Sequence, residues 1–461
     1  MSLVRLLLDH PTAPNDPIIH TLSEATTRRE LEADAERIAE QFRQCGLVAG
    51  TAVVARLANG PQLIATMFGT WMVGAVFCAV NPRATATELS AIVSSVRPAV
   101  MVDGEATVVC DDAMAYHQNA AFIVWTSGTT GAPRPVQHTH DGYLEFLDRV
   151  LRPLRVQSAP KAPMPNLIPV PLALNAGFYN ALFGLRAGAA LVMMDRFSTA
   201  DFVVLVRNFA IRSVVLPPAA IAMLTDDAAL TELSPLKYVR SITAPLSAMQ
   251  ARRFTKKFGV FVLNGYGQAE IGEVIGWTAA DARQYPDKIG AVGRPHDGVV
   301  IKVDERGHLW VRPPNAALGM DERLDAQGYI DTGDLAQIDD DGFVWIEGRA
   351  TDVINRGGNK IVPAAVEEVL ILLDSVDEAA VVGVADDRLG EVPVAFLVGR
   401  TVPDDVLVAA CREHLAAYKV PVAFHWVAEL PRNEIGKVLR GELAALVGVP
   451  APTSRASQSD R

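Results

Sequence analysis

Cysteine, basic residues and long apolar runs are all scarce in this sequence, and each shortage excludes a class of protein. The four cysteines, Cys45, Cys78, Cys110 and Cys411, lie far apart and form no CxxC pair. We expect free thiols in a reducing compartment, which excludes a disulfide scaffold and a cysteine metal cluster. The 42 Lys and Arg residues are outnumbered by 53 Asp and Glu residues, for a formal net charge of -11. Nucleic-acid binding needs clustered cations, so it is not expected, although this charge leaves room for a local cationic nucleotide pocket.

Long apolar segments are missing as well. The most apolar stretch, residues 67–80, is too short to span a bilayer and is interrupted by glycines. The apolar run near the N-terminus is too short for a secretory signal. We therefore expect no membrane span and a cytoplasmic location.

Short apolar strands alternate with helical patterns through most of the 461 residues. Thr27 and Glu30 have the spacing of a helix capping box, and Gly46 is placed to end that helix. Strands are expected at 52–57, 121–125 and 260–263, with helices between. This alternation predicts an α/β fold: a large N-terminal domain of parallel-rich sheets flanked by helices. From about residue 348 the pattern changes to a small α+β unit, with a helix over 363–373 and strands at 379–384 and 392–398.

A dense glycine and hydroxyl string follows the expected strand 121–125. Glycines let the backbone approach a ligand closely, and small hydroxyls supply short donors, which suits the phosphates of ATP. The string lacks the Gly-Lys-Ser/Thr ending of a Walker A loop. Its residues are Thr126, Ser127, Gly128, Thr129, Thr130, Gly131, Ala132, Pro133 and Arg134.

The string resembles the phosphate-binding motif of the adenylate-forming superfamily, which comprises acyl-CoA synthetases, adenylation domains of peptide synthetases and luciferases. Four further motifs follow in the family's order. Residues 264–270 (NGYGQAE) resemble its adenine and magnesium motif, and residues 329–334 (YIDTGD) resemble its ribose motif. Residues 348–354 (GRATDVI) resemble its hinge, and residues 431–437 (PRNEIGK) resemble its catalytic-lysine motif. The resemblance covers about residues 21–446.

The resemblance implies an enzyme that uses ATP to convert a carboxylic acid to acyl-AMP with release of pyrophosphate. The acyl group then passes to the thiol of coenzyme A, and Mg²⁺ assists. It implies an AMP-binding domain over 1–348, a hinge over 349–352 and a mobile catalytic-lysine domain over 353–446. Residues 447–461 form a tail rich in Ser, Pro and Ala, which we expect to be disordered.

Residue roles are implied motif by motif. Glu270 would hold Mg²⁺, a cation that prefers oxygen ligands. Lys437 would bridge the substrate carboxylate and the α-phosphate, and Arg349 would place a cation near the ribose or phosphate. Further nucleotide contacts are assigned to Thr126, Ser127, Gly128, Thr129, Thr130, Gly131, Arg134, Ala244, Pro245, Gly265, Tyr266 (stacked on adenine), Gly267, Gln268 and Asp334 (on the ribose hydroxyls). The acyl pocket is assigned to Leu174, Asn175 and Phe178, the CoA channel to Gly357 and Gly358, and the hinge to Thr351.

Several positions depart from the family pattern, including Ile242 and Thr243, which stand where two glycines are common. Arg134 replaces the common lysine of the phosphate loop, and Pro135 replaces a glycine, which stiffens the chain there. Ala269 lacks the hydroxyl of the common threonine before Glu270. Leu174 stands where many members carry His or an aromatic residue, and Thr351 stands where the hinge Asp is common.

The substrate and the acyl acceptor stay open at this stage. Asn175 sits about where amino-acid-activating domains carry an Asp, which disfavours an α-amino acid and leaves a fatty, alicyclic or aryl acid. The main interpretation is an acyl- or aryl-CoA ligase. The alternatives are a stand-alone adenylating enzyme that loads a carrier protein or an amine, and a non-catalytic nucleotide-binding homologue. A homodimer is also compatible with the sequence. His138 and His140 have no paired metal ligand and are expected at the surface.

Overall fold

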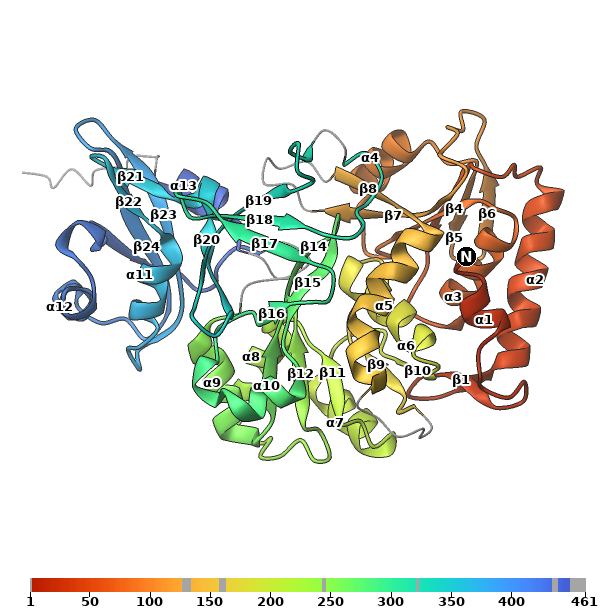
Figure 1. The fold of residues 1–461 in the computed structure, drawn as a ribbon, viewed down its shortest axis with the longest axis horizontal. Coiled ribbons are helices and arrows are strands. Elements are labelled where there is room, and N and C mark those ends of the chain that lie inside the picture. Colours follow the sequence, from red (N-terminus) through yellow and green to blue (C-terminus); the bar gives the residue numbers. More distant parts are fainter. Residues whose placement is uncertain are drawn as a thin grey trace, which may run out of the picture. The chain divides into compact units, whose positions relative to one another are not determined.

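The computed structural model describes residues 2–126, 134–156, 163–242, 246–320, 323–432 and 438–447 (Figure 1). The chain divides into two compact units. The large unit comprises Met1–Lys302, Trp310–Asp331 and Asp339–Val344, and the small unit comprises Val303–Leu309, Thr332–Ile338 and Trp345–Arg461. The chain passes between the two units within four strands, each of which has residues in both units. They are β17 (Val300–Val303), β18 (His308–Arg312), β19 (Ile330–Ile338) and β20 (Val344–Arg349).

The first sheet of the large unit has six strands in the order β6-β5-β3-β4-β7-β8. Its four inner strands are parallel, and the two edge strands pair antiparallel with their neighbours. The strands are β3 (Ala52–Arg56), β4 (Val76–Val80), β5 (Val100–Asp103), β6 (Ala106–Val109), β7 (Ala120–Thr126) and β8 (Arg134–Thr139). The helices between them are α2 (Arg28–Gln44), α3 (Pro61–Met72) and α4 (Ala86–Val96).

The predicted capping box at the start of α2 is confirmed. The Glu30 amide donates to Thr27 Oγ1 at 3.2 Å, and the Thr27 amide donates to Glu30 Oε2 at 2.8 Å. These bonds satisfy donors that a helix start leaves without intrahelical partners. Gly46 follows the helix with φ +75°, a conformation that glycine adopts without strain.

A second parallel sheet contains β11 (Ser213–Val215), β12 (Tyr238–Ser241) and β13 (Phe261–Asn264). Buried aliphatic side chains pack these strands against α7 (Thr199–Asn208), α8 (Pro218–Asp226) and α9 (Ala248–Phe258). A third, mixed sheet has the order β2-β1-β10-β9. Its strands are β1 (Pro17–His20), β2 (Ala25–Thr27), β9 (Asn166–Ile168) and β10 (Leu191–Met193).

The remaining elements of the large unit include an antiparallel sheet of β14 (Tyr266–Gln268), β15 (Gly272–Gly276) and β16 (Arg294–Pro295). Two longer helices, α5 (His140–Val156) and α6 (Asn175–Arg186), pack against each other. The short helices are α1 (Arg5–Leu8), α10 (Ala279–Gln284) and the 3-10 turn Pro286–Lys288. The predicted α/β class, with sheets flanked by helices, is confirmed.

The small unit is built on the long antiparallel pair β23 (Val376–Asp386) and β24 (Gly390–Gly399). Three short strands complete the sheet: β21 (Ile354–Arg356), β22 (Asn359–Ile361) and β25 (Ala423–Trp426). The helices are α11 (Pro363–Leu370), α12 (Asp404–His414) and α13 (Arg440–Val447), with 3-10 turns at Ala350–Asp352 and Ala417–Lys419.

Helix α11 is shorter than the predicted 363–373. Its apolar pattern continues past Leu370, but the Leu372 and Leu373 amides donate to carbonyls three residues earlier. These tight turns lead the chain into β23 and leave Leu372 50% exposed. The apolar residues of this stretch therefore lie partly on a helix face and partly in the turn that follows the helix.

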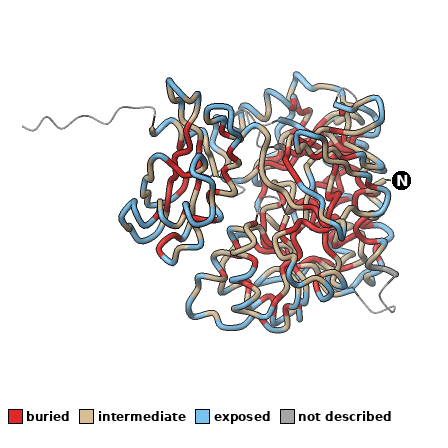
Figure 2. The backbone as a smooth tube through the Cα atoms, turned by 60° about the vertical axis from the view of Figure 1, so that its left-hand side comes forward, coloured by how far each residue is buried: buried red, intermediate tan, exposed pale blue. Residues whose placement is uncertain are grey.

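Burial within each unit follows the strands and the inner helix faces (Figure 2). The largest fully buried side chains are mostly phenylalanines, together with Arg149. No helix in the described ranges is both long enough and apolar enough to cross a membrane.

Candidate functional site

The phosphate motif connects two paired strands. β7 and β8 are antiparallel, with Thr126 opposite Arg134 and Trp125 opposite Pro135. Because β8 is the last strand of its sheet, Pro135 occupies an edge position, where a missing backbone donor is tolerated. Residues 127–133, Ala244, Pro245 and Lys437 lie outside the described residues.

The adenine motif begins where parallel strand β13 ends, at the edge where α/β sheets commonly bind ligands. The Gly265 amide donates to the Ser241 carbonyl of β12 at 2.9 Å. The Tyr266 hydroxyl accepts from Gln268 Nε2 at 3.4 Å. A Cβ atom on Gly267 would lie 2.1 Å from the Gly272 carbonyl oxygen, so only glycine fits there.

Glu270 is held at both its backbone and its side chain. Its carbonyl accepts from the Ala317 amide at 2.7 Å, and its carboxylate lies 3.3 Å from Arg323 Nη1. Arg323 also donates to the Asp331 carbonyl at 3.3 Å. The Arg323 side chain is 43% exposed, so this ion pair is weak and exchangeable. Sequence reasoning missed Arg323 because it belongs to none of the motifs.

Asp334 and Arg349 come together in the small unit. Arg349 Nε lies 2.8 Å from Asp334 Oδ1, and its Nη1 donates to the Thr332 carbonyl at 3.4 Å. The Asp334 amide in turn donates to Thr332 Oγ1 at 3.2 Å. Gly333 turns the chain with φ +71°. The ribose motif and the hinge motif, which are separate in sequence, thus form one charged pair.

The predicted hinge and CoA-channel residues lie on turns of the small unit. Thr351 is the central residue of the 3-10 turn before β21, where its hydroxyl donates to Asp352 Oδ1 at 3.2 Å. Gly357 and Gly358 join β21 to β22 with φ +57° and +88°. Two residues with positive φ form the tight hairpin turn that matches the strand twist.

The three predicted acyl-pocket residues start helix α6. Leu174 occupies the N-cap position and Asn175 is the first helical residue. Phe178 is buried among aromatic rings, with its centroid 4.5 Å from that of Phe122 and 6.1 Å from that of Phe77. Phe178 is therefore part of the core beneath the helix start.

The expectation that His138 lies at the surface is wrong. It is 1% exposed, because strand alternation turns it inward against Phe122, Tyr143 and Phe146. Burial lowers its pKa to about 3, partly offset by a hydrogen bond with the Ala269 backbone. His140 is partly buried, and its pKa is lowered to about 4 for the same reason.

Arg149 supports the segment that follows Glu270. This fully buried side chain donates to the Ile271 carbonyl at 3.2 Å and to the Glu273 carbonyl at 3.4 Å. Its charge is paired with Glu145 at 2.8 Å. Together, His138 and Arg149 tie residues 269–273 to β8 and α5, so the position of Glu270 depends on both elements.

A second buried charge pair was missed. Arg240 donates to Glu273 Oε1, and the same oxygen lies 3.3 Å from His296 Nε2. Burial opposes ionisation of Glu273, but Arg240 and His296 outweigh it and lower its pKa to about 2. The available signal was Glu273 itself, a charged residue in the apolar strand 272–276.

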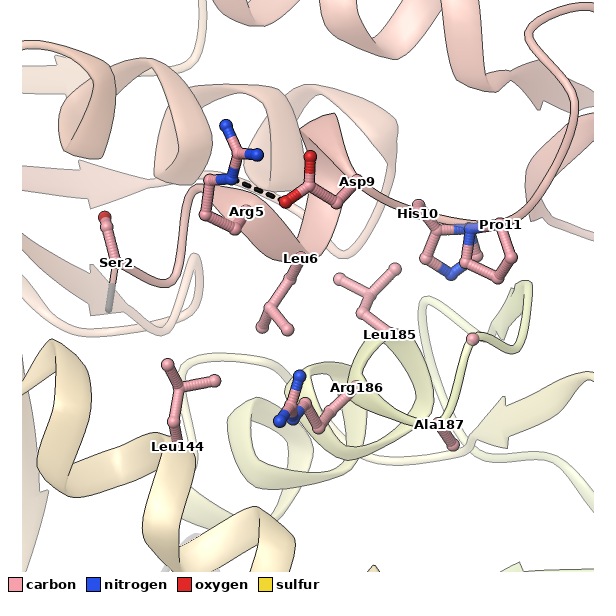
Figure 3. A pocket seen from close by; sticks show the side chains of 11 residues that line it. Ser2, Arg5, Leu6, Asp9, His10, Pro11, Leu144, Leu185, Arg186 and Ala187 are labelled. Carbon is pink, nitrogen blue, oxygen red and sulfur yellow. Dashed lines mark ion pairs between the residues drawn. The ribbon is translucent and has the colours of Figure 1, made fainter.

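A pocket of about 350 Å³ lies elsewhere on the large unit, between α1, α5 and α6 (Figure 3). Arg5 in its wall is paired with Asp9 at 2.5 Å, and Arg186 is paired with Asp148 at 2.8 Å. None of the predicted site residues lines it. Because both arginines are neutralised, we assign this pocket no role.

Comparison with known protein families identifies the family of this chain. The sequence model of the AMP-binding enzyme family matches residues 10–117 and 106–320, and that of the AMP-binding enzyme C-terminal domain matches residues 365–437. The chain belongs to the AMP-binding enzyme family.

Relatives of this chain include proteins named 2-succinylbenzoate–CoA ligase. The Bacillus cereus protein is 30% identical over 94% of this chain and 96% of its own length. The Bacillus pumilus protein is 28% identical over 90% and 92%. These relatives confirm the predicted enzyme: an AMP-forming acid–CoA ligase that acts on a small carboxylic acid with ATP and coenzyme A.

Solved structures agree with this fold. ATP-bound MatB from Rhodopseudomonas palustris has a TM-score of 0.86 at 23% identity, covering 97% of this chain and 99% of that one. The o-succinylbenzoate CoA synthetase (MenE) from Bacillus subtilis in complex with AMP has a TM-score of 0.81 at 25% identity, covering 95% and 98%. The predicted arrangement of a large N-terminal and a small C-terminal domain is confirmed by these matches.

Proposed function

We propose that this ligase activates an aryl carboxylic acid to its acyl-AMP and transfers the acyl group to the thiol of coenzyme A, with release of AMP. The observation that carries the proposal is the match, over nearly the whole chain, to ligases named for a benzoate. The core position of Phe178 supports it, because a side chain packed against Phe122 and Phe77 leaves a filled wall under α6. Such a wall favours a short, rigid acid over the fatty acid that the sequence left open.

The nucleotide would be bound by residues of the adenine and ribose motifs. Gly265 and Gly267 let this motif pack closely against Glu273 and Gly272, and Tyr266 between them offers a ring for stacking on adenine. Asp334 supplies an ionised acceptor for the ribose hydroxyls. Its pair with Arg349 holds the carboxylate in one orientation before the nucleotide arrives. The phosphate motif, residues 126–134, would donate to the β- and γ-phosphates.

Mg²⁺ fits the chemistry of Glu270. Mg²⁺ is commonly held by one or two carboxylates together with water and substrate phosphates. Glu270 offers a partly exposed carboxylate, and its weak pair with Arg323 can be exchanged for the cation. When bound, Mg²⁺ would neutralise phosphate charge that otherwise repels the attacking carboxylate.

Lys437 would position the substrate carboxylate against the α-phosphate. Three residues further along the chain, Arg440 begins helix α13. Arg440 donates to both carboxylate oxygens of Glu367, at 2.5 and 3.1 Å, and to the Val381 carbonyl at 2.8 Å. It also lies 3.7 Å from Asp352, the residue after Thr351. These contacts hold Arg440 beside Asp352, within the proposed hinge.

We propose the domain boundaries that the motifs imply, with residues 1–348 binding AMP and 353–446 presenting Lys437. Residues 349–352 would form the hinge, with Thr351 absorbing the dihedral change. The glycine turn 357–358 would border the CoA channel, because side chains are absent there and the pantetheine arm is thin.

The test is to incubate the protein with ATP, Mg²⁺ and CoA and a panel of benzoates and fatty acids, followed by mass spectrometry. Aryl-CoA and AMP are expected from a benzoate and not from a fatty acid. CoA thioesters of fatty acids alone would refute the aryl assignment. Acyl-AMP that persists with CoA present would point to a carrier protein or an amine as the acceptor.

A further inference from the structure

Arg240, Glu273 and His296 form a buried polar cluster next to the adenine motif, and Tyr179 lies near enough to interact electrostatically with Glu273 and Arg240. Tyr179 comes from α6, Arg240 from β12 and Glu273 from β15 (Figure 1). Tyr179 is 8% exposed, and the Glu273 side chain is 5% exposed. None of the four has a role in the nucleotide chemistry proposed above, so the cluster calls for a function of its own.

Two polar atoms in this cluster have no hydrogen-bond partner among the described residues: Tyr179 Oη and Glu273 Oε2. Glu273 directs only Oε1 at Arg240 and His296. Buried polar groups are nearly always hydrogen-bonded, because a group that loses its hydrogen bonds to water without replacing them costs free energy of folding. The pair thus offers one hydroxyl donor and one carboxylate acceptor that the fold itself does not use.

The electrostatics define what could satisfy both atoms. Arg240 and His296 keep Glu273 ionised despite its burial, with a pKa lowered to about 2. Burial and the negative charge of Glu273 raise the pKa of Tyr179 far above its ordinary value, so its proton stays in place. A neutral group that accepts from Tyr179 and donates to Glu273 matches this arrangement.

The cluster adjoins the region assigned to the substrate. Tyr179 lies one helical turn after Asn175, on the same face of α6. A Cβ atom on Gly265 would lie 3.1 Å from Glu273 Oε1, so the cluster touches the adenine motif directly. Gly276 also makes room, because a Cβ atom there would lie 2.6 Å from the same oxygen.

We propose that Tyr179 and Glu273 select an aryl acid that carries a hydroxyl or amino group on the ring. A substrate hydroxyl would accept from Tyr179 and donate to Glu273 Oε2, and an amino group would donate to Glu273. This inference rests on the proposed function and names its substrate class more narrowly.

The same cluster discriminates against two other kinds of acid. An unsubstituted ring leaves both protein atoms unpaired, which a site built for a hydroxyl group rejects strongly. A second carboxylate has no proton to donate to Glu273 Oε2, so it would leave that acceptor unpaired beside another acceptor. The expected substrate therefore differs from 2-succinylbenzoate, the dicarboxylic acid in the names of the relatives.

Calorimetry with non-reactive acyl-AMP analogues tests the inference without turnover. The probes are sulfamoyl adenosines bearing benzoyl, 3- or 4-hydroxybenzoyl, aminobenzoyl or carboxybenzoyl groups. At least one hydroxy or amino probe should bind about tenfold or more tightly than the benzoyl and carboxybenzoyl probes. Tyr179→Phe should abolish the hydroxyl preference and leave benzoyl binding within about twofold of wild type.

Tyr238→Phe is the matched control. Tyr238 lies on β12, as Arg240 does, but its hydroxyl accepts a hydrogen bond from Arg283 at 3.0 Å at an exposed position. The Tyr238→Phe variant should keep the wild-type preference for the hydroxy probe over the benzoyl probe. Equal binding of all probes by the wild type would overturn the inference and leave the proposed function intact. Equal weakening of all probes by Tyr179→Phe would also overturn it, because the tyrosine would then be structural. If no probe binds, the proposed function fails and the inference falls with it.

Discussion

Removing the charge of Glu273 should destabilise the large unit severely. Glu273→Gln leaves the Arg240 guanidinium buried without its counter-ion, since the two side chains are only 5% and 14% exposed. Breaking one partner of a buried pair commonly costs about 3–5 kcal/mol. A glutamine also keeps the volume of the side chain, so the loss reports on charge and not on packing.

The pH dependence provides an independent magnitude. Glu273 has an ordinary pKa of 4.5 that is lowered to about 2 in the folded chain. A folded-state pKa below the unfolded one adds stability that is complete above about pH 4.5 and lost as the pH falls toward 2. The shift corresponds to about 3 kcal/mol, of the same order as the expected mutational loss.

Urea unfolding at pH 7, followed by circular dichroism, measures the free energy of unfolding. The matched control is Glu232→Gln. Glu232 lies 3.3 Å from Arg207, and both side chains are more than half exposed. This variant should lose less than about 1 kcal/mol of unfolding free energy. The double variant Arg240→Met with Glu273→Leu should lose less than the two single variants together. If Glu273→Gln unfolds like the Glu232 control, or has the acid sensitivity of wild type below pH 4.5, the reasoning is refuted.

Three further predictions concern the chemistry. Lys437→Ala should reduce ATP–pyrophosphate exchange by about 100-fold or more while ATP binding by calorimetry largely survives; full exchange would remove the catalytic assignment. Glu270→Gln should raise the Mg²⁺ concentration needed for half-maximal exchange by about tenfold, and an unchanged Mg²⁺ titration would argue against this ligand. Arg349→Met should weaken AMP binding by about tenfold, because Asp334 loses the cation that orients it at 2.8 Å; binding equal to wild type would separate the pair from nucleotide recognition.

Local signals were sufficient for much of the fold. The capping box at Thr27 and Glu30 depends on residues three apart, and the strands at 52–56 and 261–264 follow from apolar runs bounded by turns. The enzyme family could be predicted because five motifs keep their order.

Non-local packing accounts for what the sequence could not reveal. Arg240 and Glu273 are 33 residues apart, and nothing near either residue indicates its partner. His138 was assigned to the surface by residue type, whereas its position in β8 points it into an aromatic core. Arg323 pairs with Glu270 across 53 residues from outside any motif.

The most direct test of the account is the product of one reaction. Protein, ATP, Mg²⁺, CoA and a hydroxybenzoate are mixed, and the products are identified by mass spectrometry. An aryl-CoA thioester is expected, together with equimolar AMP and pyrophosphate. Aryl-AMP that accumulates without thioester would contradict transfer to CoA, and the absence of AMP with any aryl acid would contradict the proposed activation of an aryl acid.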